Sequence, residues 1–205
     1  MGAASHIKTG LYERKMANVE AAFKNLHQDI LDACKESDLK AQFQIYKLYY
    51  KAMYNTSLRI VNDTMEAEDV MQEAFLSAFE KIDTYSGTVS FGAWLKKIVI
   101  NRSLDVLGKR KAVYEDIEAH IGIRDESTDE RARSEEIDVK VEEVKEAIER
   151  LPDGYRVILS LYLLEGYDHD EIAEILKISS STSRSQLSRA KQKLIGELKK
   201  GNENY

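Results

Sequence analysis

Apolar residues recur along this chain at helical spacing, not at the alternating spacing typical of strands. Between about residues 18 and 60 they predict two helices, joined near residues 36–38. The apolar positions in this stretch are Val19, Phe23, Leu26, Ile30, Leu31, Leu39, Phe43, Tyr46, Leu48, Tyr50, Tyr54 and Leu58. Residues 1–17 lack this period, so we expect a disordered extension or a segment of cloning origin, with Met16 as a candidate start.

The pattern continues with two further helices. Asp63 or Thr64 is a suitable cap for the first of them, whose apolar stripe runs to Ile82. Residues 83–90 are loop-like, and the second helix is predicted over 91–109. The helical spacing of Phe91, Trp94, Leu95, Ile98 and Val99 favours core packing for the two aromatic rings over stacking on a ligand.

A stretch without period then separates two halves of the chain. Residues 113–136 are acidic and contain turn-forming residues, which predicts a flexible tether. Helical spacing resumes at Ile137, and Pro152 ends that helix or opens the next one. Another helix follows and stops near Gly166.

Composition agrees with an all-α chain and excludes several classes of site. Of 205 residues, 43% are hydrophobic and one is proline, so helix breakers are rare. Cys34 is the one cysteine, which excludes an internal disulfide and a Cys/His zinc module; we expect it to be buried. No motif for a cofactor, a metal or a catalytic nucleophile is present, and no apolar run is long enough to span a bilayer. We expect a non-enzymatic, soluble, cytoplasmic protein without a cofactor.

The net charge of −6 conceals strong segregation of charge. Residues 63–80 hold six acidic side chains and no basic one, and residues 113–150 are also acidic. By contrast, residues 95–112 hold six basic side chains against one acid, and residues 177–200 hold seven against one. Two basic blocks indicate two surfaces that meet an anion, although each block alone also fits a solvated helix face.

The second basic block lies in a helix-turn-helix pattern over residues 168–198. Asp168 is placed to cap a short helix, and a turn at 177–179 leads into a longer one. The start of the second helix enters the DNA major groove in this motif. Here it carries small hydroxyl residues with Arg184 and Gln186, which suit guanine and adenine edges. A plain helical hairpin is the alternative.

Two sets of residues, in order along the chain, also resemble two regions of bacterial sigma factors of the extracytoplasmic-function group. The stretches similar to the second sigma region are Ala67-Glu68-Asp69-Val70-Met71-Gln72-Glu73-Ala74-Phe75, Phe91-Gly92-Ala93-Trp94-Leu95 and Asn101-Arg102-Ser103-Leu104-Asp105-Val106-Leu107. Those similar to the fourth region are Leu151-Pro152-Asp153-Gly154-Tyr155-Arg156, Glu171-Ile172-Ala173-Glu174-Ile175-Leu176 and Leu187-Ser188-Arg189-Ala190. The resemblance covers roughly 39–112 and 140–198, and the gap is too short for the extra domain of larger sigma factors.

The resemblance implies an all-α protein of two small domains. A region 2 helical bundle would span 18–112 and a region 4 helix-turn-helix domain 137–200, joined by a flexible acidic linker over 113–136. The implied function is to bind core RNA polymerase, recognise promoter DNA at the minus-35 and minus-ten elements, and promote melting. An anti-sigma factor is common in the group. We expect no membrane insertion, and a monomer when the protein is free.

The same resemblance assigns three sets of site residues. The contact with the coiled coil of the large polymerase subunit falls on one polar helix face, formed by Asp69, Gln72 and Glu73. The residues assigned to the minus-ten element are Lys96, Lys97, Asn101, Arg102, Lys109, Arg110 and Lys111. The residues assigned to the minus-35 element are Ser181, Thr182, Ser183, Arg184, Ser185, Gln186, Arg189 and Lys193.

Three positions depart from the family pattern. Lys177 stands where a turn glycine is usual, and it must adopt a left-handed conformation there. Ser183 replaces an apolar residue beneath the recognition helix, and Gln186 replaces a base. The alternatives are a helix-turn-helix regulator without a polymerase contact, or a helical adaptor that binds only protein.

Overall fold

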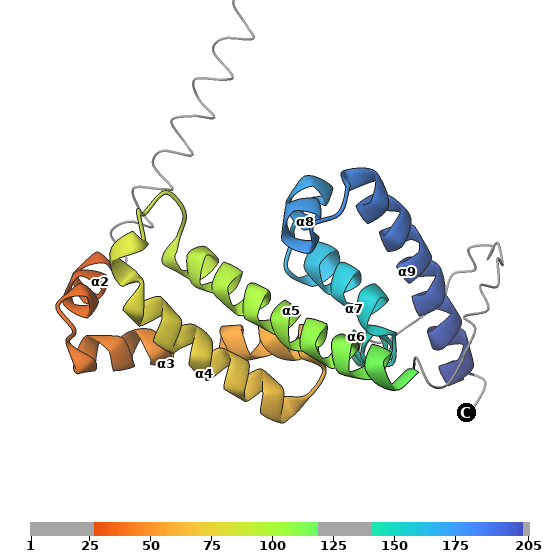
Figure 1. The fold of residues 1–205 in the computed structure, drawn as a ribbon, viewed down its shortest axis with the longest axis horizontal. Coiled ribbons are helices and arrows are strands. Elements are labelled where there is room, and N and C mark those ends of the chain that lie inside the picture. Colours follow the sequence, from red (N-terminus) through yellow and green to blue (C-terminus); the bar gives the residue numbers. More distant parts are fainter. Residues whose placement is uncertain (1–26, 119–140, 203–205) are drawn as a thin grey trace, which may run out of the picture.

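The computed structural model describes residues 27–118 and 141–202, and within these ranges every regular element is a helix (Figure 1). The N-terminal domain contains α2 (Gln28–Lys35), α3 (Leu39–Val61), α4 (Thr64–Glu80), the short η1 (Ile82–Thr84) and α5 (Phe91–Glu118). The C-terminal domain contains α6 (Val141–Glu149), α7 (Asp153–Leu159), the π-helix η2 (Ser160–Leu164), α8 (His169–Leu176) and α9 (Ser180–Asn202). The fold class predicted from the sequence is confirmed. The predicted extension and tether fall largely outside the described residues.

Short polar side chains fix where the helices of the N-terminal domain begin. The Asp38 carboxylate accepts the backbone N–H of Lys40 at 2.7 Å and caps α3. Asp63 caps α4 in the same way through the N–H of Glu66 at 2.9 Å, as the sequence predicts. Between them Asn62 ends α3 in the left-handed conformation, which asparagine tolerates better than most residues.

The core of the N-terminal domain forms where α3, α4 and α5 pack together. Phe91 is 4% exposed and contacts Trp94 with the ring centroids 5.5 Å apart, so the expected core packing of Phe91 is confirmed. Cys34 is also buried, as expected. Gly92 lies so close to the Tyr49 ring that a Cβ atom there would come within 2.9 Å of it, which explains the glycine at this position.

Part of the apolar stripe of α3 is not buried. Leu39 is 77% exposed and Phe43 is 58% exposed. The helical period therefore located the helix correctly but overstated its core face. The buried side of α3 is instead set by Ile45, Met53 and Ile60, which pack against neighbouring helices.

The helix α5 is longer than its apolar period predicts. It continues to Glu118, whereas the sequence predicts an end near residue 109 and a tether from residue 113. Gly108 does not break it, since a single glycine in a helix interior costs only about 1 kcal/mol relative to alanine and no proline follows it. The start of the predicted tether is thus helical.

The two domains are docked against each other. The hydrophobic core of the C-terminal domain includes Ile60 of α3 and Ile100 of α5, which are 0% and 1% exposed. In Figure 1 the C-terminal domain lies along α5. Docking therefore keeps two large aliphatic side chains out of water, and apolar area removed from water is stabilising by about 25 cal/mol per Å².

Polar contacts complete this interface at the carboxyl end of α3. Arg156, which is 3% exposed, donates to the carbonyl oxygen of Ile60 at 3.0 Å and to that of Leu151 at 3.0 Å. Asn62 donates across to the carbonyl of Glu149 at 3.0 Å. The last carbonyls of a helix have no partner inside it, so Arg156 satisfies a group that α3 leaves open and Asn62 does the same for the end of α6.

Candidate nucleic-acid interface

The helix-turn-helix predicted over 168–198 is present as α8 and α9. Asp168 accepts the N–H groups of Asp170 and Glu171 at 2.9 and 2.8 Å, while the Glu171 side chain accepts the N–H of Asp168 at 2.9 Å. This reciprocal capping box fixes the start of α8. Lys177 ends the helix with φ 55°, so the left-handed turn residue expected from the sequence is confirmed despite the missing glycine.

Ser183 needs a correction, because it does not face outward with the other residues predicted to contact DNA. Its side chain is 0% exposed, and its Oγ lies 3.0 Å from Nδ1 of His169. His169 in turn stacks on Tyr162, with the ring centroids 5.0 Å apart. A hydrogen bond therefore occupies the place of the usual apolar contact beneath the recognition helix. The sequence offered no signal that pairs residues 169 and 183.

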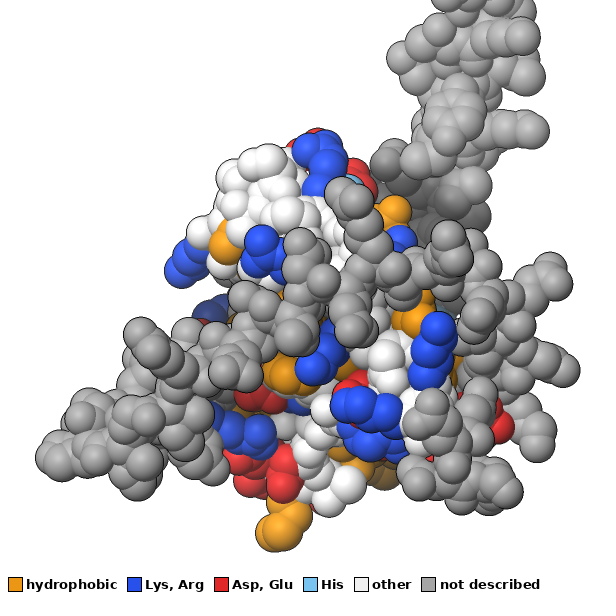
Figure 2. Space-filling view, turned by 90° about the vertical axis from the view of Figure 1, so that its right-hand side faces the viewer, with side chains coloured by type: hydrophobic (Ala, Val, Ile, Leu, Met, Phe, Trp, Pro, Cys, Tyr) orange, Lys and Arg blue, Asp and Glu red, His pale blue; other side chains and the backbone are white. Residues whose placement is uncertain are grey.

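The other residues predicted for the minus-35 element line one side of α9. Thr182 and Gln186 are partly exposed, and the remainder are exposed: Ser181, Arg184, Ser185, Arg189 and Lys193. Figure 2 shows a largely uncharged polar area at the upper part of this face, with Lys and Arg side chains around it. A small polar surface bordered by cations is suited to base edges flanked by phosphates.

The basic residues predicted for the minus-ten element do not form one free surface on α5. Lys96 lies in an ion pair with Glu165, with 2.8 Å between Nζ and Oε2. Lys97 pairs with Glu174 at 3.2 Å, and both of these side chains stay well exposed. Both lysines thus face acids of the C-terminal domain.

Other members of the same set point toward the N-terminal domain. Arg102 pairs with Glu73 at 2.6 Å. Arg110 pairs with Glu66 and donates to the carbonyl of Val61 at 2.9 Å, and the hydrogen bond that it donates to Glu66 raises the pKa of the Arg110 side chain. Asn101 and Lys109 are exposed, while the Lys111 side chain lies outside the described part of the structure.

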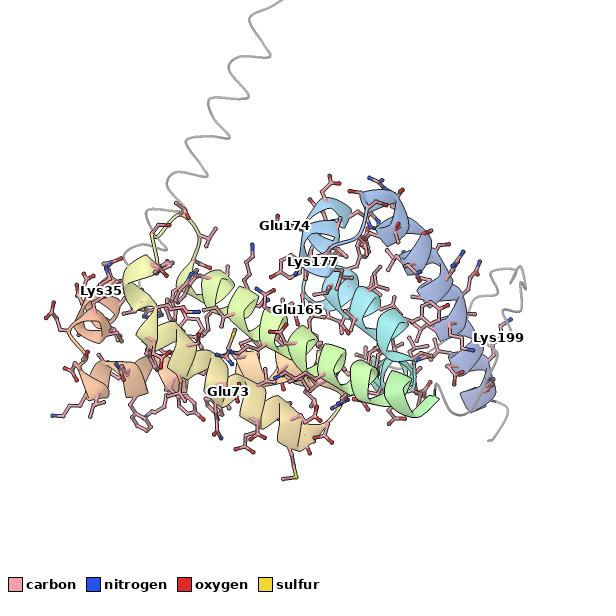
Figure 3. All side chains as sticks on the ribbon, in the orientation of Figure 1. Lys35, Glu73, Glu165, Glu174, Lys177 and Lys199 are labelled. Atoms are coloured by element: carbon pink, nitrogen blue, oxygen red, sulfur yellow. The ribbon has the colours of Figure 1, made fainter. Side chains whose placement is uncertain are left out.

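The acidic face predicted for the polymerase contact is exposed on α4. Asp69, Gln72 and Glu73 all have exposed side chains at helical spacing. Gln72 donates to Glu68 at 3.2 Å, so the acids and the amide form one continuous polar strip. In Figure 3 Glu73 lies on the side of the N-terminal domain away from the C-terminal domain. Domain docking therefore leaves this face open.

Sequence reasoning missed the residues around Glu165. This side chain is 1% exposed and lies between the domains (Figure 3). It accepts hydrogen bonds from Arg59 Nε at 3.0 Å and from Thr56 Oγ1 at 3.4 Å, in addition to its ion pair with Lys96. Burial raises the pKa of the Glu165 carboxyl, but hydrogen bonds from Lys96 and Arg59 outweigh it, and the net direction is downward.

The described residues contain neither a candidate metal-binding cluster nor a candidate membrane span. No group of three or more His, Cys, Asp or Glu side chains there is placed to hold a metal ion. None of the helices that the structure describes combines the length and apolarity needed to cross a membrane.

Comparison with known proteins identifies both halves of the chain. Residues 45–113 match the family "Sigma-70 region 2", and residues 141–194 match "Sigma-70, region 4". The RNA polymerase sigma-H factor of Pseudomonas aeruginosa is 30% identical over 176 residues, covering 80% of this chain and 90% of the relative. The ECF RNA polymerase sigma factor SigM of Bacillus subtilis is 30% identical over 152 residues, covering 74% and 91%. The chain belongs to the ECF group of RNA polymerase sigma factors.

This sigma factor also shares its fold with solved sigma factor structures. Bartonella quintana RpoE, in complex with the anti-sigma factor NepR, aligns with a TM-score of 0.54 at 23% identity, over 78% of this chain and 98% of that one. CnrH, in complex with the cytosolic domain of CnrY, aligns with a TM-score of 0.51 at 19% identity, over 83% and 95%.

Membership in the family settles the class of function. The sigma factor is a non-enzymatic transcription initiation factor that binds core RNA polymerase and DNA. A helix-turn-helix regulator without a polymerase contact would not carry a region 2 domain, so that alternative is wrong. The protein-only adaptor fails for the same reason.

Proposed function

We propose that this sigma factor contacts core polymerase through Asp69, Gln72 and Glu73, reads the minus-35 element with α9, and engages the minus-ten element with α5. The observation that supports this division most strongly is that the acidic strip on α4 and the polar start of α9 are both exposed, although the domains are docked. An acid face suits a basic partner, and small polar residues with Arg184 suit base edges.

The sharpest test of the polymerase contact is the double variant Gln72→Ala, Glu73→Ala. Its affinity for core polymerase should fall at least tenfold, because residues at a contact centre contribute most of the binding energy. Glu80→Ala, on an exposed position of the same helix, is the matched control and should bind like the unaltered chain. Equal affinity of all three proteins for core would refute the assignment of this face.

The promoter assignment needs a defined DNA target. Transcription by the reconstituted holoenzyme from a random promoter library would yield the minus-35 and minus-ten sequences directly. We expect two selected elements with a fixed separation, because two domains read them. Selection of a single element would contradict the role of one of the two basic helices.

Regulation and location follow from the same assignment. The similarity to a sigma factor solved with its anti-sigma factor supports the proposal that an anti-sigma protein also binds this chain.

Because the polymerase and the promoter lie in the cytoplasm, we propose that the protein acts there, as a monomer when it is free. A fusion to a fluorescent protein that fails to colocalise with the nucleoid would contradict this.

A further inference from the structure

The Glu165 carboxylate occupies a site that the N-terminal domain builds by itself. Thr56 and Arg59 lie three residues apart on α3 and therefore share one face of that helix. Lys96 approaches from α5 and completes a group of three donors around the two carboxylate oxygens. Only the acid comes from the C-terminal domain.

Separation of the domains would leave this group without its anion. Arg59 and Lys96 are 35% and 31% exposed even in the docked arrangement, so their side chains sit at the edge of the interface. Without Glu165 they form two adjacent positive charges next to the Thr56 hydroxyl. Such a group attracts another anion with two or more acceptor oxygens.

We infer that Thr56, Arg59 and Lys96 form a phosphate site that holds one phosphodiester of promoter DNA when the domains separate, and that Glu165 occupies this site when they dock. The inference rests on the proposed minus-ten role of α5, and it adds the α3 residues to that role. It also makes Glu165 an internal competitor of DNA.

The position of the site and its charge density favour a DNA phosphate over a carboxylate from another protein. Lys97 and the exposed Asn101 continue from Lys96 along α5, so the site lies at one end of the surface proposed to contact the minus-ten element. Arg59 uses its Nε and Nη2 atoms on the same oxygen of Glu165, and the planar guanidinium fork fits a phosphate equally well. Two cations close together match the charge density of a nucleic-acid backbone.

A single neutralised phosphate provides the decisive probe. The holoenzyme would be bound to its selected promoter with one methylphosphonate placed, in turn, at each linkage of the minus-ten region. With the unaltered sigma factor, several linkages should lower affinity, and at the linkage held by this site the loss should be about tenfold, because charged hydrogen bonds are lost there. With Arg59→Gln, that linkage should lose its effect while the others keep theirs.

The controls separate this site from general charge effects. Lys51→Gln removes an exposed cation from the same helix and should leave the methylphosphonate pattern unchanged. Arg59→Lys keeps the charge without the fork and should retain part of the sensitivity, which covers the case in which Arg59→Gln fails to fold. Identical patterns for Arg59→Gln and the unaltered chain would overturn the inference. If Arg59→Gln instead weakened core binding alone, the ligand would be a protein carboxylate and the inference would again be wrong.

The competition is tested on the full chain without polymerase. The probe is a single-stranded oligonucleotide with the selected minus-ten sequence. Glu165→Gln should raise affinity about tenfold and steepen the salt dependence by about 1.4, since two cations become available at about 0.7 each. Glu174→Gln removes the acid of the exposed pair with Lys97 and should change affinity far less.

Equal effects of the Glu165 and Glu174 variants on oligonucleotide affinity would show that Glu165 does not compete with DNA. Failure of the proposed minus-ten role of α5 would look different, because selection from the promoter library would then yield no minus-ten element. If transcription were normal but no methylphosphonate position lost its effect in Arg59→Gln, the phosphate site alone would be refuted.

Discussion

Arg102 Nη1 lies 2.6 Å from Glu73 Oε2, so an ion pair joins the helix proposed to meet DNA to the face proposed to meet polymerase. The two side chains are 35% and 63% exposed. Exposed pairs of this kind contribute about 0–1 kcal/mol to stability. Glu73 and Arg102 can therefore separate, and each can bind a group outside the chain, with little loss of folding free energy.

A comparison of Arg102 with Arg110 tests this. Arg102→Gln should change the free energy of unfolding by less than about 0.5 kcal/mol. Arg110→Gln should cost about 1.5 kcal/mol or more, because it removes a part-buried charged bond to Glu66 and leaves the Val61 carbonyl without its donor. Urea unfolding of both variants measures the difference, and equal losses would contradict it.

Domain docking should depend on pH through Glu165. Its pKa in the folded chain is below the ordinary value of 4.5, so its ion pairs stabilise docking above that value and are lost as the pH falls through the lowered pKa. Energy transfer between labels on the two domains should therefore fall at acidic pH. Glu165→Gln should lack this component of the transition, and superimposable curves for the two proteins would exclude Glu165 as the titrating group.

The bond between His169 and Ser183 should stabilise the helix-turn-helix. A double-mutant cycle with His169→Ala and Ser183→Ala should show a coupling energy of about 0.5–1.5 kcal/mol in chemical unfolding. Strict additivity of the two single variants would show that the 3.0 Å contact contributes nothing.

Base reading and phosphate contact should separate on α9. Arg184→Ala should cost about 1–3 kcal/mol in promoter affinity and relax the preference at one position. Lys193→Ala should weaken binding to all sequences alike and reduce the salt slope by about one unit. Affinities over a panel of single-base promoter variants measure both effects, and identical behaviour across the panel would invalidate the distinction.

Local features of the fold were predictable because they depend on neighbours in sequence. The caps at Asp63 and Asp168 follow from short polar side chains that precede apolar periods. The left-handed Lys177 follows from its place in the turn. The end of α5 was not predictable in this way, because nothing after Gly108 breaks a helix and the apolar period fades before the helix does.

Contacts between the domains left no such signal. The partners Lys96 and Glu165 are far apart in sequence, and neither lies in a pattern that distinguishes it from a solvated charge. Ile60 and Ile100 are not among the apolar positions that define the predicted helices, yet they pack in the core of the other domain. Ser183 takes the place of an apolar residue beneath the recognition helix, which already indicated burial, but the sequence did not indicate its partner His169.

The π-helix η2 makes the direction of the Glu165 side chain depend on the number of residues in this turn. The N–H of Glu165 bonds to the carbonyl of Ser160 at 2.9 Å, five residues back instead of four. An α-helix turns about 100° per residue, because it has 3.6 residues per turn. If all of Leu161–Leu164 stayed and wound as an ordinary α-helix, Glu165 would lie one residue further round the helix, about 100° away from Arg59 and Lys96. Deleting one residue at the same time would bring Glu165 back to nearly its present direction, so the ion pairs between the domains depend on the π-turn and the chain length together.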